Sequence, residues 1–418
     1  MALRENVLGM ARAAKSAESG MALLPTETKN AILGAMASAL RRGRRTILKA
    51  NARDLSAMRR KGRSGSIIDR LSLNAERVEG MAKGLEEIMD LKDCVGEIDD
   101  FDRRPNGLLI GKMRVPIGVI AVIYEARPNV TADCIGLCLK SGNVTILRGG
   151  SEAINSNKAI FDILRAAGEK NGMPASGINI VESTDRKAVD YLLGLTGIVD
   201  LVIPRGGESL IKEVVKKAKV PVIKHYKGVC HVYVDEFADL NIAERIAFNA
   251  KVQRPGVCNA METLLVHDDV AARFLPSLAE RLKEAGCEIR GCGLTRKIVR
   301  DAERAAESDW YEEYLDLILA VRVVKSIDEA IGHIRKYGSM HSDAIVTENY
   351  DNAMRFIREV DSACVYVNAS TRFTDGNQFG MGAEMGISTD KIHARGPMGL
   401  RELTSYKYVI LGSGQIRQ

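Results

Sequence analysis

The alternation of short apolar runs with helical stretches, beginning near Val115, constrains the fold of this chain more than any other feature. Such an alternation predicts a parallel sheet that is covered by helices on both faces. Sheets of this kind bind nucleotides at the carboxyl ends of their strands. The predicted strands are 118–124, 143–147, 178–181 and 201–203, and the predicted helices between them are 131–140 and 152–171.

A second unit with the same alternation begins near Val232 and runs past Leu317 to Val367. Residues 1–95 predict helices with breaks at Leu24–Pro25 and Lys61–Gly65, and Thr26 is a candidate N-cap. The sequence therefore predicts an α/β protein with two doubly wound domains.

A smaller β element is predicted outside these domains. Arg104–Gly107 is a turn signal between two extended segments, which predicts a hairpin over 98–115. The last fifteen residues contain an apolar strand, Lys407–Leu411, that can pair with this hairpin within the chain or across a subunit boundary. The element therefore suggests a homo-oligomer, a dimer or larger, formed by strand exchange.

The composition is that of a globular protein, with 46% hydrophobic and 27% charged residues in 418. The longest apolar stretch, Ile117–Tyr124, is too short to span a bilayer, and the amino terminus lacks the apolar core of a secretory signal. Eight cysteines at irregular spacing, without a Cys-x-x-Cys pair, argue against a disulfide scaffold or a metal site. We expect a cytoplasmic protein without a metal and without a membrane segment.

Two basic runs, Arg41–Arg45 and Arg59–Arg63, hold much of the excess positive charge. Nucleic-acid binding is one interpretation of such runs. No aromatic residue lies among them to stack on bases, which favours a solvated helical face or a helix packed beside acidic residues.

Cys258 is the candidate nucleophile. It follows Pro255 and Gly256, which predict a turn between a helix ending near Val252 and an apolar strand over 264–266. Free cysteines are usually buried as small hydrophobes, and that is the alternative interpretation. We expect it to hold for the other cysteines, which lie in apolar or amphipathic stretches: Cys94, Cys134, Cys138, Cys230, Cys287, Cys292 and Cys364.

Two glycine-rich turns follow predicted strands and are candidate phosphate sites, with tight turns as the alternative. The first is Arg148-Gly149-Gly150-Ser151, and the second contains Gly206 and Gly207. Arg148 stands at the tip of its strand, where it can pair with a ribose 2′-phosphate, which favours NADP over NAD. Asn129 follows a proline just before a helix, where its amide can donate into a site or serve as a turn residue.

Several motifs, in order along nearly the whole chain, are similar to those of the aldehyde dehydrogenase superfamily. Within it, the chain most resembles the branch that reduces γ-glutamyl phosphate in proline biosynthesis. The motifs are Tyr124–Asn129, Leu147–Ser151, Gln253–Ala260, His341–Val346, Val367–Gly376 and Phe379–Glu384.

The resemblance implies NADPH-dependent reduction of L-glutamyl 5-phosphate to L-glutamate 5-semialdehyde through a thioester on Cys258. It also implies an oxyanion hole that includes Asn129, a nicotinamide-ribose contact from Glu313, and a pyrophosphate turn at Gly206 and Gly207. The candidate substrate-binding residues are chosen by their charge alone, and a surface salt bridge is the alternative interpretation for each. They are Arg127, Arg254, Arg372, Asp375 and Glu384.

The implied domains are an NADP-binding domain (1–97, 116–230 and part of 370–402), a catalytic domain (231–369), and an oligomerisation element (98–115, 403–418). A glutamate 5-kinase is a candidate partner that would deliver the labile acyl phosphate.

One departure from the superfamily bears on the chemistry. Oxidising members carry a glutamate that activates water for thioester hydrolysis, whereas His225 stands at that position here. A missing hydrolytic base agrees with phosphate as the leaving group, although His225 can also be purely structural. The rival interpretations are a dehydrogenase for another acyl phosphate or semialdehyde, and a non-catalytic nucleotide- or nucleic-acid-binding protein.

Overall fold

The structure, a computed structural model, describes residues 2–62 and 65–417. Arg63 of the second basic run and Ser64 in the predicted break lie outside the described residues. The chain forms two compact units. The first comprises 1–224, 380–386 and 398–418, and the second comprises 225–379 and 387–397.

The amino-terminal part of the first unit is helical, as predicted. Its helices are α1 (Ala2–Ala22), α2 (Thr26–Arg60), α3 (Gly65–Leu71) and α4 (Ala75–Asp90). The prediction of Thr26 as an N-cap is wrong, because α2 already begins at Thr26 and Pro25 occupies the N-cap position. The Thr26 hydroxyl instead donates to Asp93 Oδ2 at 2.9 Å.

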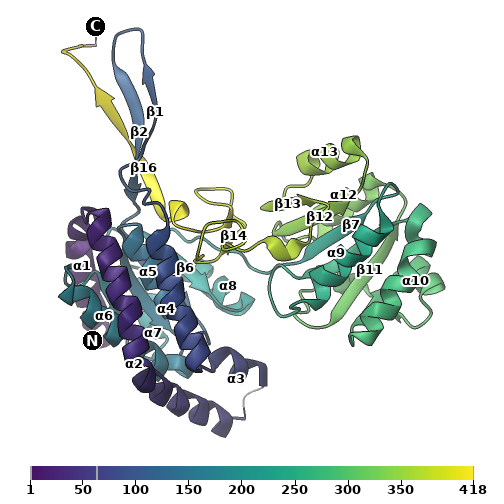
Figure 1. Ribbon diagram of the computed structural model, residues 1–418, viewed down its shortest axis with the longest axis horizontal. Coiled ribbons are helices and arrows are strands. Elements are labelled where there is room, and N and C mark those ends of the chain that lie inside the picture. The colour runs from purple at the N-terminus through teal and green to yellow at the C-terminus, as the bar shows by residue number, and fades with distance from the viewer. Residues whose placement is uncertain (1, 63–64, 418) are drawn as a thin grey trace. The chain divides into compact units, whose positions relative to one another are not determined.

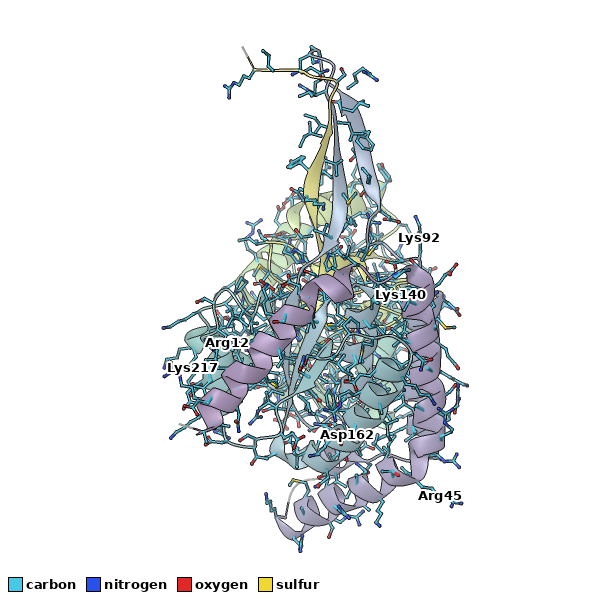
Figure 2. The ribbon with its side chains drawn as sticks, turned by 90° about the vertical axis from the view of Figure 1, so that its left-hand side faces the viewer. Arg12, Arg45, Lys92, Lys140, Asp162 and Lys217 are labelled. Carbon is cyan, nitrogen blue, oxygen red and sulfur yellow. The ribbon has the colours of Figure 1, made fainter. Side chains whose placement is uncertain are left out.

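The first basic run lies on α2 beside acidic residues of α4. The Arg41 guanidinium donates to Glu79 and to Glu86, whereas Arg45 projects outward from the helix (Figure 2). This arrangement confirms the interpretation of a helix packed beside an acidic neighbour.

A four-stranded parallel sheet forms the centre of the first unit. Its strands, in spatial order, are β5 (Ile178–Ile180), β4 (Val144–Gly149), β3 (Val119–Tyr124) and β6 (Leu201–Arg205). Its connecting helices are α5 (Asn129–Lys140), η1 (Ser151–Ala153), α6 (Ile154–Lys170), α7 (Lys187–Leu193) and α8 (Glu208–Lys217). Every residue of β3 is buried, as expected for a strand covered on both faces. Because β4 and β6 both flank β3 in parallel, the segments that follow these three strands gather at one edge of the sheet.

The smaller β element is a three-stranded antiparallel sheet (Figure 1). The predicted hairpin is present as β1 (Ile98–Arg103) and β2 (Leu109–Pro116). The terminal strand β16 (Thr404–Leu411), preceded by η4 (Arg401–Leu403), pairs with β2 along its whole length within the same chain. One backbone edge of β16 is therefore left without a strand neighbour in the described part of the chain.

The second unit is built on a seven-stranded parallel sheet. In spatial order its strands are β10 (Glu303–Arg304), β9 (Glu288–Gly291), β11 (Ile318–Val324), β8 (Met261–His267), β7 (Cys230–Val234), β12 (Ser342–Val346) and β13 (Cys364–Val367). Its helices are α9 (Leu240–Val252), α10 (Asp268–Glu284), α11 (Gly293–Ile298), η2 (Glu307–Tyr311), α12 (Ile327–Tyr337), α13 (Tyr350–Glu359) and η3 (Thr371–Phe373). A short antiparallel pair, β14 (Ile387–Ser388) and β15 (Gly396–Pro397), completes the unit.

Helices cover both faces of this sheet. Val232 and Val234 of β7 pack in one apolar cluster with residues of α9 and α10. Tyr233, which points to the opposite face, packs in another cluster with residues of α12 and α13. The strongly buried β8 lies between β11 and β7, so the loop that precedes β8 has a rigid support. None of the described helices is both long and apolar enough to cross a membrane.

Candidate active site

Cys258 lies in the loop between α9 and β8, which confirms the predicted order of helix, turn and strand. Helix α9 begins at an N-cap, where the Asp239 carboxylate accepts from the backbone N–H groups of Asn241 and Ile242. It ends at Val252, and Pro255 and Gly256 then form a turn. The thiol is thus presented on a short, stiff connection.

Exposure separates Cys258 from most of the other cysteines. All eight lie in the described part of the chain and are free; among them only Cys258 and Cys292 are half-buried, and the other six are buried. The expectation of burial was therefore wrong for Cys292, which stands just before α11. Burial by itself would raise the pKa of Cys292, but hydrogen bonds from Thr295 and Val323 lower it.

Hydrogen bonds fix the backbone beside the thiol. The Asn259 side chain is buried and donates to the carbonyl oxygen of Thr374 at 2.8 Å. The Thr371 hydroxyl donates to the carbonyl oxygen of Asn259 at 2.8 Å. These bonds attach the cysteine loop to the η3 segment, so the orientation of Cys258 depends on residues more than a hundred positions away.

Gly228 packs directly against the backbone of Cys258. A Cβ added to Gly228 would lie 1.8 Å from the carbonyl oxygen of Cys258 and 2.9 Å from its Cα. Only a residue without a side chain permits this approach. The backbone N–H of Gly228 donates to Glu313 Oε1 at 2.8 Å, so the predicted cofactor-binding glutamate lies near the cysteine loop.

Two predicted substrate-binding arginines lie near the thiol. The Arg372 guanidinium donates to Gln253 Oε1 at 2.9 Å and also to Asn259 Oδ1. Burial lowers the pKa of Arg372, the positive charge of Arg254 lowers it further, and the charges of Asp375 and Cys258 oppose this shift. Arg372 therefore lies within electrostatic reach of Arg254, Asp375 and Cys258.

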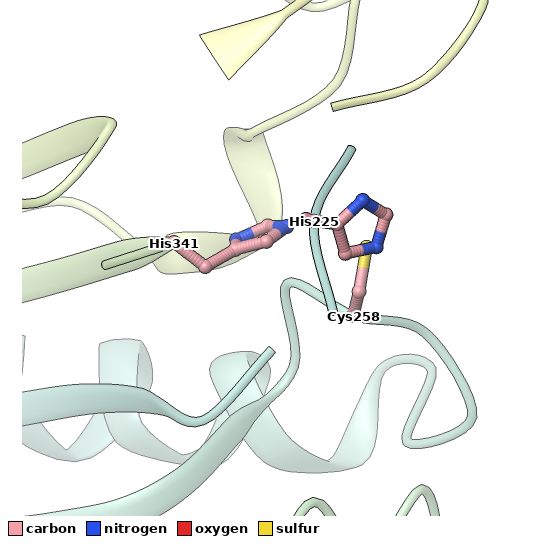
Figure 3. A group of neighbouring side chains, drawn as sticks. All are labelled: His225, Cys258 and His341. Carbon is pink, nitrogen blue, oxygen red and sulfur yellow. The ribbon is translucent and has the colours of Figure 1, made fainter. Parts of the chain in front are cut away.

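Two histidines also approach the thiol (Figure 3). Ligand-type atoms of His225, Cys258 and His341 all lie within 4.8 Å of one another, and the two imidazole rings are 5.5 Å apart in an edge-to-face arrangement. His341 was not predicted as a site residue. Its only signal in the sequence was its place in one of the motifs similar to the superfamily, because the fold alone unites positions 225, 258 and 341.

The predicted phosphate turns gather at the carboxyl edge of the first unit's sheet. Gly149, Gly150 and Ser151 lead from β4 to α6, and Gly206 and Gly207 lead from β6 to α8. The Gly207 N–H donates to Glu125 Oε2 at 3.2 Å. A carboxylate thus already occupies the amino end of α8, which is where the helix dipole favours an anion.

Arg148 is buried at the end of β4. Its Nη2 donates to the carbonyl oxygen of Thr184 at 3.3 Å, and its Nε has no hydrogen-bond partner among the described residues. Burial lowers the pKa of Arg148, and the charges of Glu152 and Arg186 then act in opposite directions. Arg186, which sequence reasoning missed, is a second cation near this turn.

Asn129 is the first residue of α5 and its side chain is exposed. Its amide donates to Asp133 Oδ2 at 3.1 Å, and burial raises the pKa of Asp133 to about 6. Asn129, Arg127 and Glu384 belong to the first unit and Cys258 to the second. Their roles at the thiol therefore stay predictions.

Comparison with known proteins identifies the family. Residues 1–288 match the family model described as the aldehyde dehydrogenase family. The chain belongs to the aldehyde dehydrogenase family. The aldehyde dehydrogenase-like α/β fold expected from the sequence is thereby confirmed.

Relatives within the family are similar over essentially the whole chain. The gamma-glutamyl phosphate reductase of Caldanaerobacter subterraneus is 60% identical over 98% of this chain and 99% of its own. That of Thermodesulfovibrio yellowstonii is 55% identical over 100% of both chains. The crystal structure of gamma-glutamyl phosphate reductase from Thermotoga maritima has a TM-score of 0.96 and 50% identity, and covers 99% of this chain and 100% of that chain.

Proposed function

We propose that this chain catalyses the NADPH-dependent reduction of L-glutamyl 5-phosphate to L-glutamate 5-semialdehyde and phosphate, a step of proline biosynthesis in the cytoplasm. The observation that carries the proposal is the half-buried thiol of Cys258, held in a stiff turn with two arginines beside it. Full-length relatives that are 55–60% identical and named gamma-glutamyl phosphate reductase support the same substrate.

The reaction follows from the thiol. Cys258, as the thiolate, attacks the γ-carbonyl carbon, and the departing phosphate leaves a thioester on the sulfur. NADPH supplies the hydride that reduces this thioester. The hemithioacetal on Cys258 then collapses, releasing the aldehyde and regenerating the thiolate. The amide of Asn129 and the backbone N–H of Cys258 are the proposed oxyanion donors, each worth about 3 kcal/mol of transition-state stabilisation.

The substrate carries a phosphate and an α-carboxylate, both of which need cations. Arg372 is well suited because Asn259 and Gln253 orient its guanidinium before the substrate arrives. Arg254 supplies a second positive charge, and Asp375 supplies a negative charge for the α-ammonium group. Arg127 and Glu384 remain candidates for the same contacts.

The residue at the position of the superfamily's hydrolytic glutamate supports phosphate as the leaving group. His225 Nδ1 lies 2.8 Å from the carbonyl oxygen of Ile387, and this contact orients the ring. The stretch Lys224–Gly228 carries no carboxylate that would activate water towards the thioester. Without such a base, the thioester survives until it is reduced.

The test runs the reaction in reverse, because glutamyl phosphate is unstable. Glutamate 5-semialdehyde, NADP and the protein are mixed with and without inorganic phosphate, and the absorbance of the reduced cofactor is followed. We expect reduction of NADP that requires phosphate. Reduction without phosphate would mean that water resolves the thioester, and no reduction by a folded protein in either condition would exclude this substrate.

The first unit offers residues that fit a phosphorylated nicotinamide cofactor. The amino end of α8 already binds the carboxylate of Glu125, so it can bind a pyrophosphate once that side chain moves aside. The unpartnered Nε of Arg148 is a donor available to a 2′-phosphate. The other proposed cofactor contacts in this unit are Gly149, Gly150, Ser151, Gly206 and Gly207, and the second unit is proposed to contribute Glu313.

Arg148→Met should weaken NADPH binding selectively. A charge-assisted hydrogen bond to phosphate contributes about 1.5–3 kcal/mol, so the Kd for NADPH should rise about 10–100-fold while that for NADH stays within about twofold. Titration by cofactor fluorescence measures both constants. Arg165→Met, which removes an exposed arginine of α6, is the matched control. An equal loss for both cofactors would contradict the proposed role of Arg148.

We also propose that the protein is a homo-oligomer that associates through β16. Tyr406, Tyr408 and Ile410 are exposed on one face of this strand, whose outer edge is unpaired in the described chain. A sedimentation-velocity experiment that finds only monomer at micromolar concentration would contradict this. Association with a glutamate 5-kinase remains a proposal that a pull-down with the purified kinase would test.

A further inference from the structure

His225, Cys258 and His341 together form a set of possible metal ligands, a property that the proposed reaction does not use. The three side chains come from separate segments of the second unit and converge on one another (Figure 3). His341 is fully buried, and its Nε2 has no hydrogen-bond partner among the described residues. A buried nitrogen without a partner needs a physical explanation, and a bound ion is one such explanation.

The hydrogen bonds of the two rings determine which nitrogen of each ring carries the proton. His225 Nδ1 faces the carbonyl oxygen of Ile387, which can only accept, so Nδ1 carries the proton and the lone pair is on Nε2. His341 Nδ1 lies 2.9 Å from Ser342 Oγ, which in turn contacts Thr374 Oγ1 at 2.6 Å. This hydroxyl chain can accept the Nδ1 proton and leaves a lone pair on Nε2 of His341 as well. Metal-binding histidines are oriented in this way.

We propose that His225, Cys258 and His341 bind one soft divalent cation of the Zn²⁺ class, with a fourth coordination position open to solvent. One thiolate and two imidazole nitrogens are a ligand set that zinc prefers. Bond lengths of about 2.0–2.3 Å in a tetrahedral site separate ligand atoms by about 3.3–3.6 Å. The present separations, within 4.8 Å, therefore need side-chain movements of about 1 Å. The thiol proton passes to solvent on binding.

The charges around the cluster indicate a reversible inhibitor rather than a permanent structural ion. Arg254 and Arg372 disfavour a dication near Cys258, whereas the thiolate and Asp375 favour it. A sulfur atom bound to the metal cannot attack a carbonyl carbon, so occupancy of the site blocks turnover. Binding of the metal is independent of the proposed function, and only the inhibition rests on it.

The test titrates Co²⁺, a coloured substitute for Zn²⁺, into the metal-free protein. We expect one Co²⁺ per chain, with a thiolate-to-cobalt absorption band that Zn²⁺ abolishes by displacement. Cys258→Ala should remove the band. His225→Asn should lower the affinity at least about 100-fold, since even residues that only support metal ligands affect it 10–100-fold. The asparagine amide can still donate to Ile387, and His341→Asn can likewise keep its contact with Ser342.

Two controls separate this site from other metal-binding groups. His267→Asn alters the second cluster of possible ligands, formed with Glu236 and Asp269, and should leave the band unchanged. Cys292→Ser removes the other half-buried thiol and should also have no effect. A band that persists in Cys258→Ala or keeps its full affinity in His225→Asn would overturn the proposal.

Measurements of activity distinguish the proposed metal site from the proposed role of Cys258 as the nucleophile. Zn²⁺ should inhibit the wild-type enzyme at the concentration at which it displaces Co²⁺, and a chelator should restore activity. A cobalt band that needs both Cys258 and His225, without inhibition of a measurable reductase activity, would establish the metal site and contradict Cys258 as the nucleophile. The His225→Asn variant tests metal binding even if His341→Asn fails to fold. His225 is only half-buried, so we expect its substitution to leave the fold intact.

Discussion

Cys258→Ala is expected to lower turnover by more than about 10⁴-fold while NADPH still binds with an unchanged Kd. The reason is that alanine removes the sulfur on which the thioester forms and leaves the first unit, where the cofactor turns lie, untouched. Steady-state kinetics in the direction of semialdehyde oxidation and a cofactor titration measure the two quantities. A non-catalytic binding protein would show no functional change in this variant.

Cys292→Ala is the matched control, because Cys292 is the other half-buried thiol and hydrogen bonds lower its pKa. The exposure of Cys292 and its lowered pKa would by themselves make Cys292 a candidate for the catalytic nucleophile. We expect this variant to keep wild-type turnover and to lose one of two sites that react with a thiol-specific alkylating reagent. If instead Cys292→Ala is inactive and Cys258→Ala is active, the assignment of the nucleophile is wrong.

Gly228→Ala is expected to lower kcat at least about 100-fold, because a misplacement of reacting groups by about 1 Å has an effect of that size. The added Cβ would meet the carbonyl oxygen of Cys258 at 1.8 Å. That contact is with backbone, so no side-chain rotation relieves it and one of the two segments must move. We expect the free energy of unfolding to fall by about 3 kcal/mol as well.

Gly332→Ala provides the control, because the same substitution should there have the opposite sign. Gly332 lies within α12, and a Cβ added to it would meet nothing within 4 Å. Alanine at this position should raise the free energy of unfolding by about 0.5–1 kcal/mol and leave kcat unchanged. Denaturant unfolding and kinetics on both variants measure these effects. Full activity in Gly228→Ala would contradict the direct contact between the backbones of Gly228 and Cys258.

The fold was largely predictable because its signals are local. A buried parallel strand such as β3 is a continuous apolar run in the sequence. The turn residues Arg104–Gly107 directly indicate the hairpin of β1 and β2. The assignment of Thr26 failed because a hydroxyl at a helix start can cap the helix or bind elsewhere, and Asp93, far along the chain, decides between these.

The site was predictable only in part. Pro255 and Gly256 mark the turn that presents Cys258. No local pattern reveals that His341 reaches this thiol, because its position depends on the pairing of β12 with β7. Likewise, the hydrogen bonds that Asn259 and Gln253 make with Arg372 arise only once η3 packs against the cysteine loop.

The close approach of Gly228 to Cys258 also limits how this chain can be recombined with its relatives. The segments around residues 228 and 258 have backbones shaped to each other, with no side chain between them to absorb a mismatch. A chimaera with a crossover between these positions would join segments from two parents that never adapted to one another. Crossovers outside this interval keep the pair from one parent, so libraries of recombined enzymes should yield active members chiefly from such junctions.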